Sequence, residues 1–312
     1  MNPTRRSLLL APALLAAPAR AEPQPDLSFV IPYASGGGFD AYVRAVIPAL
    51  QTRLGRRVLP DNRDGAGGAR AANALYRAKP DGATISVVNL PGALILQQQG
   101  GLGFDLAELS WLANMGRDAY GLVVPASSDL HSLDDLRALG LRRKVKFTCV
   151  GPAGTAYSAT RIGTRLLNIE ARVIAGYKGT SDYIVAAMRG DGDAAVASLT
   201  ALSQFLKAGL VRPLATFEEH SSLPGVADAT TLGQPELADI VQLRPVAAPP
   251  GLPQSLRQTL SEALVTALRD PAVIAWARRN NANLQPDDAD TTARLYAQQS
   301  RFIARWKDEL AA

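Results

Sequence analysis

The sequence predicts an α/β protein made of two α/β units, and three observations indicate this. Short β-rich runs alternate with segments of helical apolar periodicity along most of the chain, a pattern typical of a mostly parallel sheet with helices on both faces. A glycine-rich strand-to-helix loop occurs near the start, at 36–38, and again near the middle, at 151–154. The 312 residues, 47% of them hydrophobic, are enough to form the cores of two domains.

The first 21 residues have the features of a cleaved signal peptide. Arg5 and Arg6 precede a short apolar run, and a small-x-small cleavage site follows at 19–21. Two prolines interrupt the apolar run, which is too short to anchor the chain in a bilayer. Residues 4–9 also resemble a twin-arginine signal, so both export routes stay open. We therefore exclude residues 1–21 from the fold and expect a periplasmic protein.

The charge of the chain argues against nucleic-acid binding, and its cysteine content excludes an intramolecular disulfide. The chain has 33 basic and 28 acidic residues, and loss of the three arginines of the signal segment leaves a net charge of +2. No long lysine and arginine run remains, so we expect no nucleic-acid binding. Cys149 is the only cysteine, and no intramolecular disulfide can form. It lies in a β-rich run, where a buried small hydrophobe is expected.

The first unit opens with a strand at 29–31 and a run of three glycines. Gly36, Gly37 and Gly38 let the backbone adopt positive φ and approach a bound group closely. Asp40 is expected to be the N-cap of the helix that follows, whose apolar residues recur with a 3.6-residue period. Free N–H groups at a helix start bind anions without a lysine. Neither the Gly-x-Gly-x-x-Gly pattern nor Gly-Lys-Ser/Thr is present, which excludes dinucleotide and P-loop sites.

The alternation continues to the end of the first unit, where a strand stops at Asn89. Ligands of such sheets lie outside the carboxyl ends of the strands, so we expect Asn89 and Pro91 to face the triple-glycine loop. The elements predicted between the two loops are a strand at 57–59, a second glycine-rich loop at 61–68, a helix at 69–78, a turn at 79–82 and a strand at 83–88.

The second unit repeats the opening design. A strand at 144–150 leads into the loop 151–155 and a helix at 156–167. Thr155 is expected to cap this helix, to donate its hydroxyl to a carboxylate, or to do both, and Thr180 or Ser181 is expected to cap a later helix. The other predicted elements are strands at 122–125, 172–174, 194–197 and 211–215, a helix to 139 opened by a capping box at 132–135, and helices to 188 and over 200–208.

The end of the chain returns to the first unit and then becomes helical. The extended segment 241–248 is interpreted as the return, and Pro249-Pro250-Gly251 ends it. Helices with apolar faces suited to packing are predicted at 253–269, 271–279 and 291–310.

No constellation for catalysis or metal binding is found. His131 and His220 lie in loop-like sequence without a ligand-spaced partner, which leaves a zinc site or a Ser-His-Asp triad unsupported. The acidic run 287–290 is interpreted as a solvated helix start, and no calcium-loop spacing occurs. We expect no catalytic residue, no metal and no cofactor, and hence no enzyme.

Six motifs occur in the same order as in the Bug extracytoplasmic solute receptors, the binding components of tripartite tricarboxylate transporters. The resemblance covers essentially the whole mature chain. The motifs are Val30-Ile31-Pro32-Tyr33 with Gly36–Asp40, Asn62–Gly68, Lys79–Thr84, Tyr177-Lys178-Gly179, Lys207-Ala208-Gly209 and Ala248–Pro253.

This resemblance implies a type II periplasmic-binding-protein fold, in which two α/β domains joined by two crossovers clamp a small carboxylate between them. It implies domain 1 at 22–122 and 245–312 and domain 2 at 123–244. The expected partners are the carboxylate and the membrane permease components of the transporter, and we expect the receptor itself to be a monomer.

The two glycine-rich loops then become opposing anion cradles. Asp40 either caps its helix or pairs with a ligand amino group, Tyr177 and Lys178 form a wall or a solvated turn, and Ser198 points toward the cleft by analogy. The predicted ligand-binding residues are Tyr33, Ser35, Gly36, Gly37, Gly38, Phe39, Asp40, Asn89, Pro91, Gly154, Thr155, Ala156, Tyr157, Tyr177, Lys178 and Ser198.

Departures from the family pattern leave the ligand open. The family usually has Pro and Thr where this chain has Ser35 and Phe39, and commonly His where it has Ser158. Phe39 places an aromatic wall beside the first cradle, so an organic acid, an aromatic acid or an amino acid are all considered. Two further roles stay open: a ligand-sensing receptor of the same fold that acts in signalling, and an enzyme on this fold.

Overall fold

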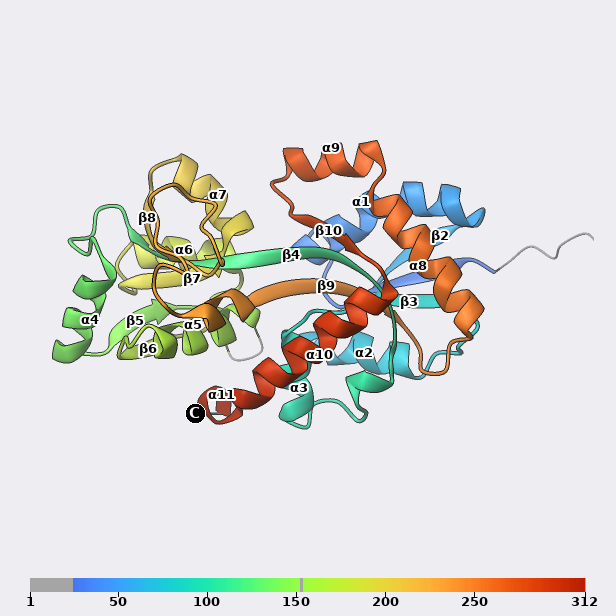
Figure 1. Cartoon of the computed structure of the whole chain (residues 1–312), viewed down its shortest axis with the longest axis horizontal. Coiled ribbons are helices and arrows are strands. Elements are labelled where there is room, and N and C mark those ends of the chain that lie inside the picture. The colour runs from blue at the N-terminus through green and yellow to red at the C-terminus, as the bar shows by residue number, and fades with distance from the viewer. Residues whose placement is uncertain (1–24, 152–153, 312) are drawn as a thin grey trace, which may run out of the picture.

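The computed structural model describes residues 25–151 and 154–311 and shows two lobes joined by two long strands (Figure 1). The predicted signal peptide lies outside the described residues. The joining strands are β4 (Ser110–Pro125) and β9 (Val241–Ala248), which pair antiparallel. The first part of β4 pairs with β9, and its last part, from Tyr120, pairs with strands of the second lobe. The predicted α/β fold with two crossovers is confirmed, whereas the exact domain boundaries stay a prediction.

The first lobe has a mixed sheet in the strand order β2-β1-β3-β9-β4. Its three leading strands pair in parallel, and β9 is antiparallel to both of its neighbours. The elements of this lobe before β4 are β1 (Leu27–Ile31), α1 (Gly38–Leu54), β2 (Val58–Asn62), η1 (Ala66–Gly68), α2 (Ala69–Tyr76), β3 (Thr84–Val87), α3 (Gly92–Gln98) and η2 (Leu106–Glu108).

The second lobe continues the same sheet with the order β4-β7-β5-β6, and β8 also pairs with β4. The strands β5, β6 and β7 are parallel. The elements of this lobe are α4 (Leu133–Arg142), β5 (Val145–Thr148), α5 (Thr155–Leu166), β6 (Ala171–Ile174), α6 (Thr180–Met188), β7 (Ala194–Ser198), α7 (Leu199–Lys207), β8 (Val211–Thr216) and η3 (Pro235–Asp239).

The C-terminal segment packs first on the first lobe and then reaches the second. The long helix α10 packs on β4, and α11 contacts α5, where Arg161 and Glu309 form an ion pair of 2.9 Å. Figure 1 shows α10 and α11 running beneath the two joining strands. The segment comprises α8 (Gln254–Leu268), α9 (Pro271–Arg279), β10 (Leu284–Asp287), α10 (Ala289–Arg305) and α11 (Lys307–Ala311).

Several predicted helix starts are wrong. Asp40, Thr155 and the pair Thr180/Ser181 were each expected to cap a helix, but the N-cap residues are Gly37, Gly154 and Gly179, none of which makes a side-chain cap. A capping side chain must accept a bond from the first helical N–H groups. Asp40 accepts from other donors instead, and the hydroxyl of Thr155 faces Tyr120 and Gln242, so both helices begin earlier.

Among the other sequence predictions, two are confirmed, one helix is divided into two, and two elements were missed. The capping box of Ser132 and Asp135 is confirmed, and so is the burial of Cys149. The predicted helix 291–310 is divided at Trp306 into α10 and α11. Helix α3 was missed because its seven residues follow Pro91 directly and only the last two are polar, and β10 was missed because it is short and half-buried.

We predict that Gly163→Ala destabilises the second lobe. Alanine in a helix interior is ordinarily favoured over glycine by about 1 kcal/mol. A Cβ at Gly163, however, would lie 2.6 Å from Cζ of Phe217, a fully buried ring that cannot move aside. Overpacking of this kind costs about 1–3 kcal/mol, so the urea midpoint should fall. Gly103→Ala, where a Cβ meets nothing within 4 Å, is the control and should leave the midpoint unchanged.

Candidate ligand-binding cleft

A cleft of about 300 Å³ lies where the two lobes meet. The first lobe contributes Tyr33, Phe39 and Asn89, and the joining strands contribute Tyr120 and Gln242. The lining residues from the second lobe are Val150, Gly154, Thr155, Ala156, Thr180, Tyr183 and Ser198.

The cleft is neutral and partly aromatic. None of its lining residues carries a charged side chain, and four of them are aromatic. The rings of Tyr33 and Phe39 pack with centroids 5.1 Å apart and form one wall. Such a site selects its ligand by shape and by hydrogen bonds, with no fixed side-chain charge in contact.

Three helices contribute first-turn residues to the lining of the cleft. Helix α1 contributes Phe39, α5 contributes Thr155 and Ala156, and α6 contributes Thr180. Each of these helices begins at a glycine N-cap without a side-chain cap, so the first backbone N–H groups have no capping acceptor from a side chain. Helix N-termini carry partial positive charge, and together these three favour an anionic group.

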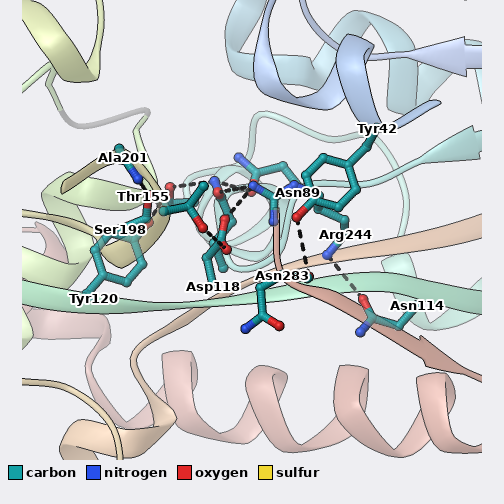
Figure 2. A network of polar contacts seen from close by, with 12 residues as sticks. Tyr42, Asn89, Asn114, Asp118, Tyr120, Thr155, Ser198, Ala201, Arg244 and Asn283 are labelled. Carbon is teal, nitrogen blue, oxygen red and sulfur yellow. Dashed lines mark hydrogen bonds and ion pairs between the residues drawn. The ribbon is translucent and has the colours of Figure 1, made fainter. Parts of the chain in front are cut away.

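Polar side chains connect the lobes at the floor of the cleft (Figure 2). Nε2 of Gln242, on β9, donates to Oγ1 of Thr155 at 3.0 Å and lies 3.5 Å from Oδ1 of Asn89. The Tyr120 hydroxyl lies 2.8 Å from the same Thr155 oxygen. Nδ2 of Asn89 donates to the Tyr33 hydroxyl at 2.6 Å. The floor therefore contains groups from both lobes and from both joining strands.

A buried ion pair lies directly behind this floor. Nη2 of Arg244 is 2.6 Å from Oδ2 of Asp118, and the side chains are 6% and 1% exposed. The same Nη2 donates to Oε1 of Gln242 at 3.1 Å, and the Thr200 hydroxyl donates to the other Asp118 oxygen. The Arg244 guanidinium carbon lies 4.3 Å from the ring centroid of Tyr42 and 5.2 Å from that of Phe39.

The aromatic contacts account for the remaining guanidinium atoms. Nε and Nη1 of Arg244 are buried and have no hydrogen-bond acceptor among the described residues. Stacking on aromatic faces is the usual alternative for a guanidinium group in such a position. Burial raises the pKa of Tyr42 to about 12, so its hydroxyl stays protonated and donates to the Asn283 carbonyl oxygen.

The structure brings some of the predicted ligand-binding residues together and leaves others apart. The first group lines the cleft: Tyr33, Phe39, Asn89, Gly154, Thr155, Ala156 and Ser198. The second group does not line it: Ser35, Gly36, Gly37, Gly38, Asp40, Pro91, Tyr157, Tyr177 and Lys178.

The residues outside the cleft have identifiable positions. The three glycines are exposed, and Pro91 is the buried N-cap of α3. Tyr157 packs against a hydrophobic core cluster that includes residues of both lobes. Tyr177 donates to Asp191, and with Lys178 it lines a separate surface hollow beside α6.

Asp40 is held by protein groups. Its carboxylate accepts from Arg44 Nε at 2.9 Å, from the Gly36 N–H at 2.9 Å and from Asn62 Nδ2 at 3.0 Å. Burial raises the pKa of this carboxyl, but these hydrogen bonds outweigh the burial and lower the pKa to about 2. Asp40 therefore fixes the glycine loop to α1, with its carboxylate oxygens already occupied.

Sequence reasoning missed Tyr120, Gln242, Thr180, Tyr183 and Val150. Gln242 had a readable signal, because Gln242 and Arg244 are polar residues at alternate positions of a segment predicted as a strand, where they share one face. Gly92 was also passed over. A Cβ there would lie 2.8 Å from Nδ2 of Asn89 and 3.5 Å from Cγ2 of Thr155, which shows how closely the lobes approach.

Two lobes, two joining strands and a neutral cleft between the lobes define a two-domain solute-binding protein. The model for the tripartite tricarboxylate transporter family receptors matches residues 42–310. BugT of Bordetella pertussis is 27% identical over 319 residues, which cover 98% of this chain and 96% of BugT. The protein of the gbd 5′ region of Cupriavidus necator is 28% identical over 274 residues, 83% of this chain and 80% of the relative. The chain belongs to this receptor family.

Solved structures share the fold. MatC from Rhodopseudomonas palustris with bound malate has a TM-score of 0.74 at 21% identity, covering 92% of this chain and 99% of MatC. Another protein of that organism, with adipate, has a TM-score of 0.75 at 22% identity, and the match covers 92% of this chain and 97% of that protein. The periplasmic binding protein BugD has a TM-score of 0.73 at 18% identity, and the match covers 92% of this chain and 98% of BugD. The resemblance to the Bug receptors is confirmed.

Within 25–151 and 154–311, no cluster of His, Cys, Asp and Glu could hold a metal ion. The helices of the same residues include none with the length and apolar character to cross a bilayer.

We predict that Asp40 makes stability depend on pH in the acid range. Its folded-state pKa of about 2 lies below the ordinary value of 3.8, so the stabilisation is fully present above about pH 4 and is lost as the pH falls toward 2. Asp40→Asn should lower the free energy of unfolding at pH 7 and flatten its decline between pH 4 and 2, measured by urea denaturation. Asp64→Asn removes an exposed loop carboxylate and should keep the natural slope. Equal slopes for Asp40→Asn and the natural chain would contradict this role.

Proposed function

We propose that this protein is a periplasmic receptor that captures a small carboxylate for the membrane permease of a tripartite tricarboxylate transporter. The observation that carries the proposal is a cleft lined by first-turn residues of α1, α5 and α6, three helices that begin at glycine N-caps without a side-chain cap. Backbone N–H groups at these positions bind an anion, and the absence of charged side chains from the lining leaves room for the organic part of the acid.

The relatives support a carboxylate over other anions. Malate is bound in one structural neighbour and adipate in another, and both neighbours share the fold over nearly their whole length. In this chain Tyr33 and Phe39 form an aromatic wall. We therefore infer an acid with an apolar or aromatic part, and include aromatic acids and amino acids among the candidates.

The mechanism proposed is selection by closure. The ligand contacts groups from both lobes, so it stabilises the arrangement in which the lobes lie together. The permease then receives the closed form. We propose that the receptor acts as a monomer with a cleaved signal peptide.

A sensing role would use the same cleft and the same closure, and adjacent permease genes would favour transport over sensing. An enzyme is a weaker alternative, because the lining residues include no histidine and no carboxylate to serve as a general base.

We predict that a carboxylic acid stabilises the mature chain, residues 22–312, in a thermal-shift screen. The compounds are malate, adipate, benzoate, citrate, amino acids and sugars. Ligand at a hundredfold excess over its Kd should add about 2.7 kcal/mol, which raises the midpoint by a few degrees at roughly 2–4 °C per kcal/mol. Stabilisation by a sugar and by no acid would contradict the carboxylate proposal.

We also predict that Thr155→Val weakens binding of the acid found in that screen. The substitution keeps the shape of the side chain and removes the hydroxyl at the floor of the cleft. Loss of one buried hydrogen bond to a charged group costs about 1.5–3 kcal/mol, or roughly 10–100-fold in Kd by calorimetry. Thr259→Val, which removes an exposed hydroxyl on α8, is the matched control. Unchanged affinity in Thr155→Val would remove this hydroxyl from the site.

A further inference from the structure

Arg244 determines which groups donate and which accept hydrogen bonds at the floor of the cleft. A guanidinium group has donors and no acceptor. Its Nη2 lies 3.1 Å from the Gln242 side-chain amide, so the atom of Gln242 that faces it must be the oxygen. The Gln242 nitrogen is therefore turned toward Thr155 and Asn89, at 3.0 and 3.5 Å. No other assignment of this amide satisfies both sides.

The orientation of the Gln242 amide also fixes the hydrogen bonding of Thr155 and Tyr120. Because Gln242 can only donate, the Thr155 oxygen accepts from it. The Thr155 and Tyr120 hydroxyls lie 2.8 Å apart and share one hydrogen bond, which uses one of their two protons. Apart from the Gln242 nitrogen that donates to Thr155, neither oxygen has a further partner among the described residues. Whichever of the two donates, one O–H proton of the pair is left for a group in the cleft, which both residues line.

The first-lobe side of the cleft, at Asn89 and Tyr33, also presents a hydrogen-bond donor. Nδ2 of Asn89 donates to the phenol oxygen of Tyr33 at 2.6 Å, and the Asn89 oxygen lies 3.5 Å from the Gln242 nitrogen. The Tyr33 proton is then left for the cleft. On the other side, the Ser198 oxygen accepts from the Ala201 N–H at 3.3 Å, and its hydroxyl proton is also free to donate.

Burial keeps these protons in place. It raises the pKa of Tyr33 and raises that of Tyr120 well above the ordinary range, so both phenols stay protonated at physiological pH. The hydroxyl groups of Tyr33, of Ser198 and of the Thr155 and Tyr120 pair therefore give the cleft hydrogen-bond donors from both lobes. A carboxylate has acceptors only, whereas an amide or an ammonium group must also place its own protons.

We propose that Arg244 is a positioning residue for ligand choice: through Gln242 it turns the floor of the cleft into a hydrogen-bond donor surface and so selects carboxylates over amides and amines. The inference rests on the proposed function and deepens it. Arg244 itself does not line the cleft, and Asp118 holds it in position from behind.

Gln242→Glu tests whether the cleft needs a hydrogen-bond donor at this position of the floor. The new carboxylate keeps an acceptor toward Arg244, so the buried cation stays paired. It also turns an acceptor toward Thr155, takes up the spare proton of the Thr155 and Tyr120 pair, and adds negative charge at the floor. Gln254→Glu introduces the same charge at the exposed first turn of α8 and serves as the control.

The probes are adipate, malate and benzoate, each compared by calorimetry with its own amide. We expect the natural chain and Gln254→Glu to bind at least one acid more than about tenfold tighter than its amide. We expect Gln242→Glu to lose about 100-fold or more in affinity for that acid and to change less than about tenfold for the amide. These factors correspond to one or two charge-assisted hydrogen bonds.

Two further variants separate positioning from structural support. Arg244→Lys keeps a donor without an acceptor and should retain the preference for the acid. Asp118→Asn combined with Arg244→Met removes both charges, which avoids leaving one buried charge unpaired, and frees the Gln242 amide to turn over. In that variant the preference for the acid should fall to about threefold or less, at a thermal midpoint that shows a folded chain.

The outcomes distinguish the two proposals. If the natural chain prefers an acid over its amide and Gln242→Glu and the double variant keep that preference, the role of Arg244 is overturned and the proposed function stands. If the natural chain binds no acid, or binds acid and amide equally, both proposals fail.

Discussion

The arrangement of the two lobes depends on the antiparallel pairing of β4 with β9, and on the ion pair buried between these strands. Asp118 and Gln242 are partners in the register of that pairing, and Arg244 lies two residues further along the same face of β9. A charge pair so completely buried repays its desolvation only when its geometry is good and its remaining atoms are satisfied. Here Thr200 and Gln242 supply hydrogen bonds, and two aromatic rings cover the guanidinium group, whose Nε and Nη1 have no acceptor among the described residues. The polar groups of the cleft are arranged around this fixed point.

In the function and the role of Arg244 proposed above, the cleft combines two means of attracting an acid. The helix N-termini supply partial positive charge from the backbone, and the side chains at the floor supply protons in a fixed direction. Neither requires a lysine or arginine in contact with the ligand. A neutral lining avoids the desolvation of a fixed charge on binding, and it lets the aromatic wall of Tyr33 and Phe39 discriminate by shape.

The sequence predicted the architecture better than the site. The glycine-rich loops and the strand 241–248 were readable, because glycine and alternation act locally. The first part of β4 was not, since buried polar residues such as Asn114 and Asp118 break the apolar pattern, and only partners distant in sequence make their burial tolerable. Asp40 was misjudged for a similar reason: its nearest partner, Arg44, is visible in the sequence, but Asn62 is brought to it only by the fold. Gln242 acquires its meaning from Arg244 and Thr155 together, which no local pattern reveals.

The C-terminal helices give the molecule a third connection between the lobes. Helix α10 packs on β4 and the first lobe, while Gln299 donates to the backbone of η3 and Arg161 of α5 holds Glu309 of α11. Separation of the lobes has to stretch or release these contacts as well as bend the two strands. The free energy of opening therefore includes a contribution from the end of the chain, far from the ligand. Since apparent affinity scales with the fraction of molecules in the binding-competent arrangement, evolution can tune this receptor's affinity at its C-terminus without altering a single residue of the cleft.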